Sequence, residues 1–117
     1  MGGFSANDIM MIALDLDNNK ITFGKNGQWA DGSGNANQTY ANSTAAYTNL
    51  TAGEFYVPAQ AKRAYGSNFG TNNYNFGNGY FGTTAVSSAG TNASGNGIFE
   101  YNVPTGFTAL STKGLNL

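Results

Sequence analysis

The sequence predicts an all-β protein, an antiparallel sandwich of two sheets, from its composition and from two patterns along the chain. Aromatic residues make up 14% of the 117 residues, and 17 residues are glycine, a composition typical of short strands joined by tight turns. Residues 12–17 alternate between two sets of side chains, which is the period of a half-buried strand. Turn-forming Asn and Gly residues recur between the apolar segments. A chain of this length is sized for one domain, so we expect residues 1–117 to form a single sandwich.

The first predicted element is a hairpin. Ile12, Leu14 and Leu16 lie on one predicted face of its first strand. Asn18-Asn19 suits a two-residue turn into a second strand over residues 20–25, because asparagine tolerates positive φ. The predicted register pairs apolar with apolar and acid with base: Leu16 with Ile21, Leu14 with Phe23, and Asp17 with Lys20. Asn26-Gly27 is a further turn signal before Trp29.

Three more short strands are predicted later in the chain, separated by polar loops. They cover residues 54–60, 74–76 and 98–103. Pro58 favours an edge or irregular position for the first of these, because proline cannot donate a hydrogen bond to a sheet. The Gly-, Asn- and Ser-rich segment 30–51 is expected to be a long surface excursion.

Charge and residue content argue against several functions. Only 9% of residues are charged and the net charge is −1, so no field would attract nucleic acid or anionic lipid. The longest apolar run, residues 9–14, is far shorter than a membrane span, and we expect no membrane insertion. The chain contains neither His nor Cys, which rules out Ser-His-Asp and Cys-His triads and most zinc and copper sites. We therefore expect a protein that is not an enzyme and uses no cofactor.

Two carboxylates were the best candidates for chemistry, and the pattern favours a structural role for both. Asp15 and Asp17 share a strand face, a spacing that resembles paired catalytic carboxylates. They lie on a polar face, however, with Asp17 beside Lys20 and Asp15 opposite Thr22, where nothing would raise the pKa of an acid. With Asn19 they also match the start of a calcium loop, but the glycine and the glutamate that such a loop needs are missing. No catalytic, metal or cofactor residue is predicted.

The aromatic residues divide into two groups. The six in strand or turn-end positions are expected in the core: Phe23, Trp29, Phe55, Phe76, Phe99 and Phe107. Five tyrosines lie in or near polar loops, where an amphipathic ring serves as an interface anchor or stacks on a sugar. These candidate interaction residues are Tyr40, Tyr47, Tyr65, Tyr74 and Tyr80.

Four segments, in order, give the chain a resemblance to a known family. They are DIMMIALDLDNNKITFGKNGQW at residues 8–29, FYVPA at 55–59, YNFG at 74–77 and VPTGFTAL at 103–110. Together they resemble the C-terminal portion of the SPRY-like domains of phage structural proteins. No single segment is diagnostic, but the four span nearly the whole chain.

The resemblance implies a concanavalin-like, SPRY-like jelly roll that binds instead of catalysing. It implies a virion location, in a tail, a fibre or a capsid decoration, with other virion proteins or identical subunits as partners. The strands that open the family's domain normally precede the segment that begins here at Asp8. We therefore expect an incomplete sandwich whose open edge is covered by a neighbouring chain. The alternative is a lectin-like module that binds a host-surface glycan, since the fold alone does not establish function.

Overall fold

The computed structural model describes residues 3–60, 71–90 and 95–111, and within these ranges the chain is built from strands and turns with almost no helix. The all-β class is confirmed. The elements in chain order are β1 (Met10–Asp15), β2 (Lys20–Lys25), β3 (Gln28–Ala30), β4 (Ala36–Gln38), the 3-10 helix η1 (Tyr40–Asn42), β5 (Tyr80–Phe81) and β6 (Thr84–Ala85).

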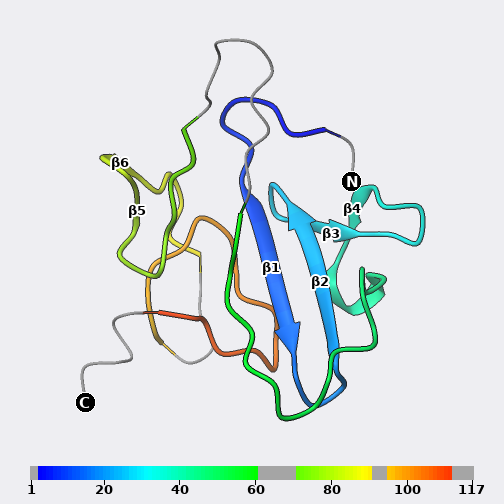
Figure 1. Ribbon diagram of the computed structural model, residues 1–117. Helices are drawn as coiled ribbons and strands as arrows, with labels where there is room; N and C mark the ends of the chain where they lie inside the picture. The colour runs from blue at the N-terminus through cyan, green and yellow to red at the C-terminus, as the bar shows by residue number, and fades with distance from the viewer. Residues whose placement is uncertain (1–2, 61–70, 91–94, 112–117) are drawn as a thin grey trace.

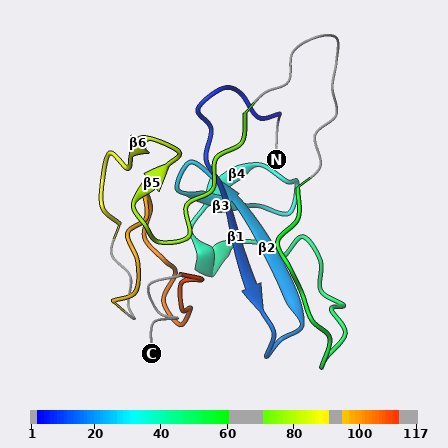
Figure 2. The same cartoon turned by 60° about the vertical axis from the view of Figure 1, so that its left-hand side comes forward.

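The strands form two antiparallel sheets of unequal size. The larger sheet has the order β1-β2-β3-β4, so each strand pairs with its neighbour in sequence, and the smaller sheet is the β5-β6 hairpin. Figure 1 shows the long β1 and β2 arrows side by side and the small hairpin away from them. In Figure 2 residues 51–60 run on one side of β1 and β2, and residues 99–111 run on the other. The larger sheet therefore has chain on both sides.

The first hairpin forms, but its predicted register is wrong by two residues. Asp15 pairs with Lys20 and Leu14 with Ile21, so the turn has four residues instead of two. The Asp15 carboxylate explains the longer turn, because its Oδ1 accepts a hydrogen bond from Asn18 N at 3.0 Å. A shift of two residues keeps every side chain on its predicted face.

The turn between β2 and β3 confirms the signal at Asn26-Gly27. Lys25 pairs with Gln28, which leaves two residues in the turn, with φ of 52° at Asn26 and 86° at Gly27. Both residues have positive φ, as the tight hairpin turn that follows the twist of the strands requires. A Cβ at residue 27 would also meet the Tyr101 ring at 2.9 Å. Glycine is needed here for its conformation and for space.

The larger sheet buries the side of β1 that carries Ala13 and not the side that carries Ile12. Ala13, Thr22 and Trp29 are between 2% and 6% exposed, whereas Ile12 is 51% and Leu16 is 53% exposed. The close approach at Gly24 explains the preference, since a Cβ there would lie 2.7 Å from a backbone oxygen and 3.1 Å from Trp29 Cε3. Small residues on this side leave room for the indole against the sheet, and Ile12 lies on the more open side.

The three later strands do not form as predicted. Residues 54–60 and 74–76 contain no strand, and residues 98–103 contribute only two isolated bridges, Asn78 to Ile98 and Gly90 to Phe99. The predicted core position of Phe55 is also wrong, because its side chain is 98% exposed. Phe76 is 38% exposed, and Trp29 alone among the six predicted core aromatics is fully buried.

Candidate interaction surface

The four candidate tyrosines that the structure describes occupy different environments. Tyr47, Tyr74 and Tyr80 are 54%, 54% and 48% exposed, so their rings are available at the surface. Tyr40 is half-buried, and Tyr65 lies outside the described residues. Of the four tyrosines that the structure describes, three are therefore exposed and one is half-buried.

Tyr47 is fixed by its backbone beside β2. Ile21 N donates to Tyr47 O at 2.9 Å, and the amide of Ala46 donates back to Ile21 O at 2.9 Å. These bonds place the Tyr47 segment against the part of β2 that β3 does not reach. A well-anchored backbone with an exposed ring costs little further conformational entropy on binding.

Tyr74 lies in a second ordered segment. Its ring stacks parallel to Phe76, with centroids 6.1 Å apart and planes inclined by 3°. The residue between them anchors the backbone, because Asn75 Nδ2 donates to Ile98 O at 2.9 Å and its Oδ1 accepts from Gly77 N at 2.8 Å. Two parallel, partly exposed rings thus face the same way on a fixed loop.

Tyr40 has a packing role. Its ring meets Trp29 edge to face at 5.2 Å and Phe107 at 4.8 Å. The three rings join β3, η1 and the segment near residue 107 into one aromatic cluster. Such edge-to-face pairs add about 0.5–1.5 kcal/mol each beyond the burial of their area.

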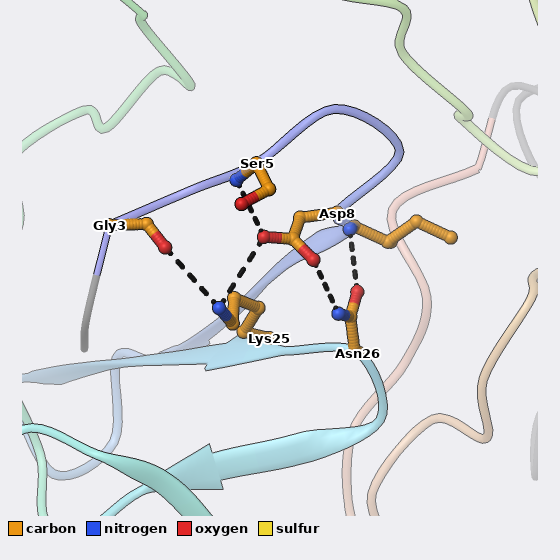
Figure 3. A network of polar contacts seen from close by, with 6 residues as sticks. Gly3, Ser5, Asp8, Lys25 and Asn26 are labelled. Atoms are coloured by element: carbon orange, nitrogen blue, oxygen red, sulfur yellow. Dashed lines mark hydrogen bonds and ion pairs between the residues drawn. The ribbon is translucent and has the colours of Figure 1, made fainter.

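A polar network ties the residues before β1 to the turn after β2 (Figure 3). Asp8 is its centre: Oδ2 accepts from Ser5 N at 2.7 Å and lies 3.4 Å from Lys25 Nζ, and Oδ1 accepts from Asn26 Nδ2 at 2.7 Å. Asn26 Oδ1 in turn accepts from Ile9 N at 2.8 Å. The amide of Ser5, followed by Asn26 and Lys25, lowers the pKa of Asp8 below its ordinary value. We call this network of Ser5, Asp8, Ile9, Lys25 and Asn26 the clamp. It fixes the chain before β1 to the turn after β2 and favours the ionised form of the Asp8 carboxylate.

Three other carboxylates that accept hydrogen bonds also have a lowered pKa. The pKa values of Asp15, Asp31 and Glu100 are lowered, first by hydrogen bonds from Asn18, Asn35 and Ser87 respectively. A general acid needs the opposite shift. Asp17 lies exposed in the turn after β1, and the Asp15 carboxylate binds Asn18 and Lys20. Within the described ranges no group of three or more Asp or Glu side chains could hold a metal ion.

A hollow of 270 Å³ lies beside the larger sheet. It is lined by Phe23, Ala30, the loop at residues 31–34 and residues 44–46. The Asp31 carboxylate at its rim accepts hydrogen bonds from Ser33 N and Asn35 N, each at 2.8 Å. This carboxylate therefore holds the conformation of its own loop.

In the described part of the chain, no helix is long and apolar enough to cross a membrane.

Sequence patterns alone do not show that several large apolar residues are exposed. Met10 and Ile12 on β1 are 45% and 51% exposed, and Phe55 and Val57 are 98% and 80% exposed. Alternation indicates which side chains share a face, but it does not show which face is covered. One feature of the sequence does indicate the buried face. The small residues Ala13, Thr22 and Gly24 share that face and leave room for Trp29.

Comparison with protein-family models, with curated proteins and with solved structures finds no match for this chain.

Proposed function

We propose that the chain is a non-enzymatic structural or interaction module of a phage virion, in a tail, a fibre or a capsid decoration. In this proposal the two sheets belong to a SPRY-like jelly roll that a neighbouring chain completes. The four sequence segments that resemble the family support the assignment to a virion. The observation that carries the binding role is the exposure of large apolar and tyrosine side chains.

The small core supports this role. Among the described residues the buried apolar side chains are those of Ala13, Trp29 and Ala30, whereas thirteen large hydrophobic residues are exposed. Single exposed apolar residues are normal, but exposed aromatic and aliphatic side chains in this proportion indicate surfaces that are covered in an assembly. The 9% content of charged residues also favours close packing between subunits, because few charges would have to be desolvated.

The experiment is a direct search for the chain in purified particles of the virus that encodes it. Quantitative mass spectrometry should find the chain at a fixed number of copies per particle, and immunogold labelling should place it on one virion component. Its absence from particles that contain the other structural proteins would contradict the proposal.

One observation favours the second candidate, a lectin-like module. The rings of Tyr74 and Phe76 form a stacked, partly exposed aromatic pair, with the Tyr74 hydroxyl 2.9 Å from Gln60 Oε1. Flat aromatic surfaces beside amide groups suit the apolar face of a sugar ring. Binding on a glycan array that Tyr74→Ala abolishes would support this function, and no binding at high protein concentration would remove it.

A further inference from the structure

β1 is at the edge of the larger sheet. The strand order β1-β2-β3-β4 gives β1 one neighbour, and no other described segment pairs with it. Figure 1 shows β2 beside β1 and no further strand arrow on its other side. An edge strand presents a row of backbone N–H and C=O groups that another strand can use.

The hydrogen bonds identify which residues present those groups. Residues of an antiparallel strand alternate between bonding to the neighbour and pointing away from it. Asn26 N donates to Ile9 O at 3.0 Å. In the register of β1 and β2, the odd-numbered residues of β1 therefore form hydrogen bonds to β2. On β2, Ile21 faces Leu14 but bonds to residues 46–47 on its other side. Both observations leave three residues with outward-pointing backbone groups: Met10, Ile12 and Leu14.

The same edge is apolar and without charge. The segment from Ile9 to Leu14 contains no charged side chain, and its exposed residues Met10 and Ile12 lie next to the outward-pointing backbone groups. A native edge strand is commonly protected by lysine, proline or a bulge. The described β1 has none of these along its six residues.

A second copy of β1 fits this edge. In an antiparallel pair centred on Ile12, each Ile12 lies opposite Ile12 of the second copy, and each Met10 lies opposite Leu14. All three outward-pointing residues then find bonding partners, because the even-numbered residues of both copies meet. The two Asp15 carboxylates end roughly 20 Å apart, from the rise of about 3.3 Å per residue over six positions, beyond the screening length of about 8 Å at physiological salt. Charge therefore does not oppose this register.

We propose that two copies of the chain join through their β1 strands in this antiparallel register and form one continuous sheet across a two-fold axis. The inference rests on the proposed function as a binding module and names its partner and its surface. The exposed aliphatic residues Met10 and Ile12 would be buried from both copies at the junction. A two-fold contact of this kind closes on itself, so it yields a dimer and not a fibre.

The test uses the absence of cysteine from the sequence. Ile12→Cys and Leu16→Cys each introduce one thiol at positions of nearly equal exposure, 51% and 53%. In the proposed dimer the two residues 12 lie about 5.5 Å apart between Cα atoms, within the range of a disulfide. The two residues 16 lie roughly 26 Å apart. Under mild oxidation I12C should give a covalent dimer at least tenfold faster than L16C.

Sedimentation of the full chain completes the experiment. The wild type should have twice the mass of the 12.2 kDa chain, and Ile12→Lys should give a monomer, since it places two like charges opposite each other. Leu110→Lys, at an exposed residue outside β1, should leave the dimer intact, and circular dichroism should show that both variants are folded.

Three results would overturn the pairing: a monomeric wild type, equal oxidation of I12C and L16C, or an oligomer that I12K does not dissociate. Each would leave the search in purified particles to decide the proposed function separately.

Discussion

At the scale of single residues, the Asp8 carboxylate joins the chain before β1 to the end of β2 and the turn that follows it. It accepts hydrogen bonds from Ser5 N and Asn26 Nδ2 and pairs with Lys25. These contacts need an ionised carboxylate, and its pKa is lowered in the folded chain, first by the bond from Ser5. A lowered folded-state pKa stabilises the fold above the unfolded value of about 3.8. That stabilisation is lost as the pH falls through the folded value.

The first prediction follows from the lowered pKa of Asp8 in the folded chain. The urea midpoint of the wild type should fall as the pH is lowered from about 6 to below the ordinary carboxyl value of 3.8. Asp8→Asn should unfold at lower urea than the wild type at pH 6, and the two midpoints should converge at the acid end. Asp17→Asn removes one carboxylate from the exposed turn and serves as the control. If D8N and D17N give the same profile, the clamp contributes nothing to stability.

The candidate tyrosines also belong to the residue scale. The polar sequence that flanks Tyr47, Tyr74 and Tyr80 agrees with their exposure, and their role in binding stays a prediction. Sequence reasoning could not separate Tyr40 from them, since the ring of Tyr40 is covered by Trp29 and Phe107, which lie 11 and 67 positions away in sequence. Neighbours of this kind depend on the tertiary path of the chain.

At the scale of elements, the two turns of the first hairpin region use asparagine in different ways. Asn19 and Asn26 have nearly equal φ, 53° and 52°. Asn26 also binds Ile9 and Asp8 through its side chain, whereas the hydrogen bond of Asn19 to Leu50 uses the backbone carbonyl. A comparison of Asn19 with Asn26 therefore separates two contributions to stability: that of the positive-φ backbone conformation and that of the side-chain hydrogen bonds to Ile9 and Asp8.

The second prediction compares their alanine variants. Asn19→Ala should lower the free energy of unfolding by about 1 kcal/mol, because asparagine tolerates the left-handed conformation better than alanine does. Asn26→Ala should lower it by about 2–3 kcal/mol, because two side-chain hydrogen bonds are also lost. Urea unfolding followed by circular dichroism measures both. Equal losses would mean that the bonds to Ile9 and Asp8 are exchanged for water without cost.

The elements that could be predicted from sequence are those set by local rules. Alternation located β1 and β2, and the Asn-Gly pair located the turn to β3. The register of the first hairpin was missed because the Asp15 side chain supports a longer turn; an aspartate before two asparagines is itself a turn signal. Residues 54–60 have strand-forming composition but no strand partner among the described residues. Strand pairing is non-local, so composition alone could not decide it.

At the scale of the whole molecule, the aromatic cluster of Trp29, Tyr40 and Phe107 connects segments that are distant in sequence. It joins the larger sheet to the chain near residue 107, which Figure 2 shows on the side of the sheet away from residues 51–60. With so few other large side chains buried, this cluster carries much of the long-range packing.

The third prediction tests that connection. Phe107→Ala should lower the free energy of unfolding by about 2 kcal/mol, from lost apolar burial and the lost edge-to-face contact. Phe55→Ala removes an equal side chain that is 98% exposed and should change stability by less than about 0.5 kcal/mol. Thermal unfolding of the two variants beside the wild type measures the difference. An F55A effect as large as that of F107A would place the principal packing elsewhere.

The position of Trp29 has an optical consequence. It is the one tryptophan of the chain, it is 6% exposed, and the Tyr40 ring lies 5.2 Å from it. Shielded from water, the indole will emit at shorter wavelength in the native protein than in the denatured chain. Ultraviolet light absorbed by Tyr40 will pass to it by energy transfer across that short distance. The single tryptophan thus reports whether β3 and η1 are in place, with no label attached to the protein.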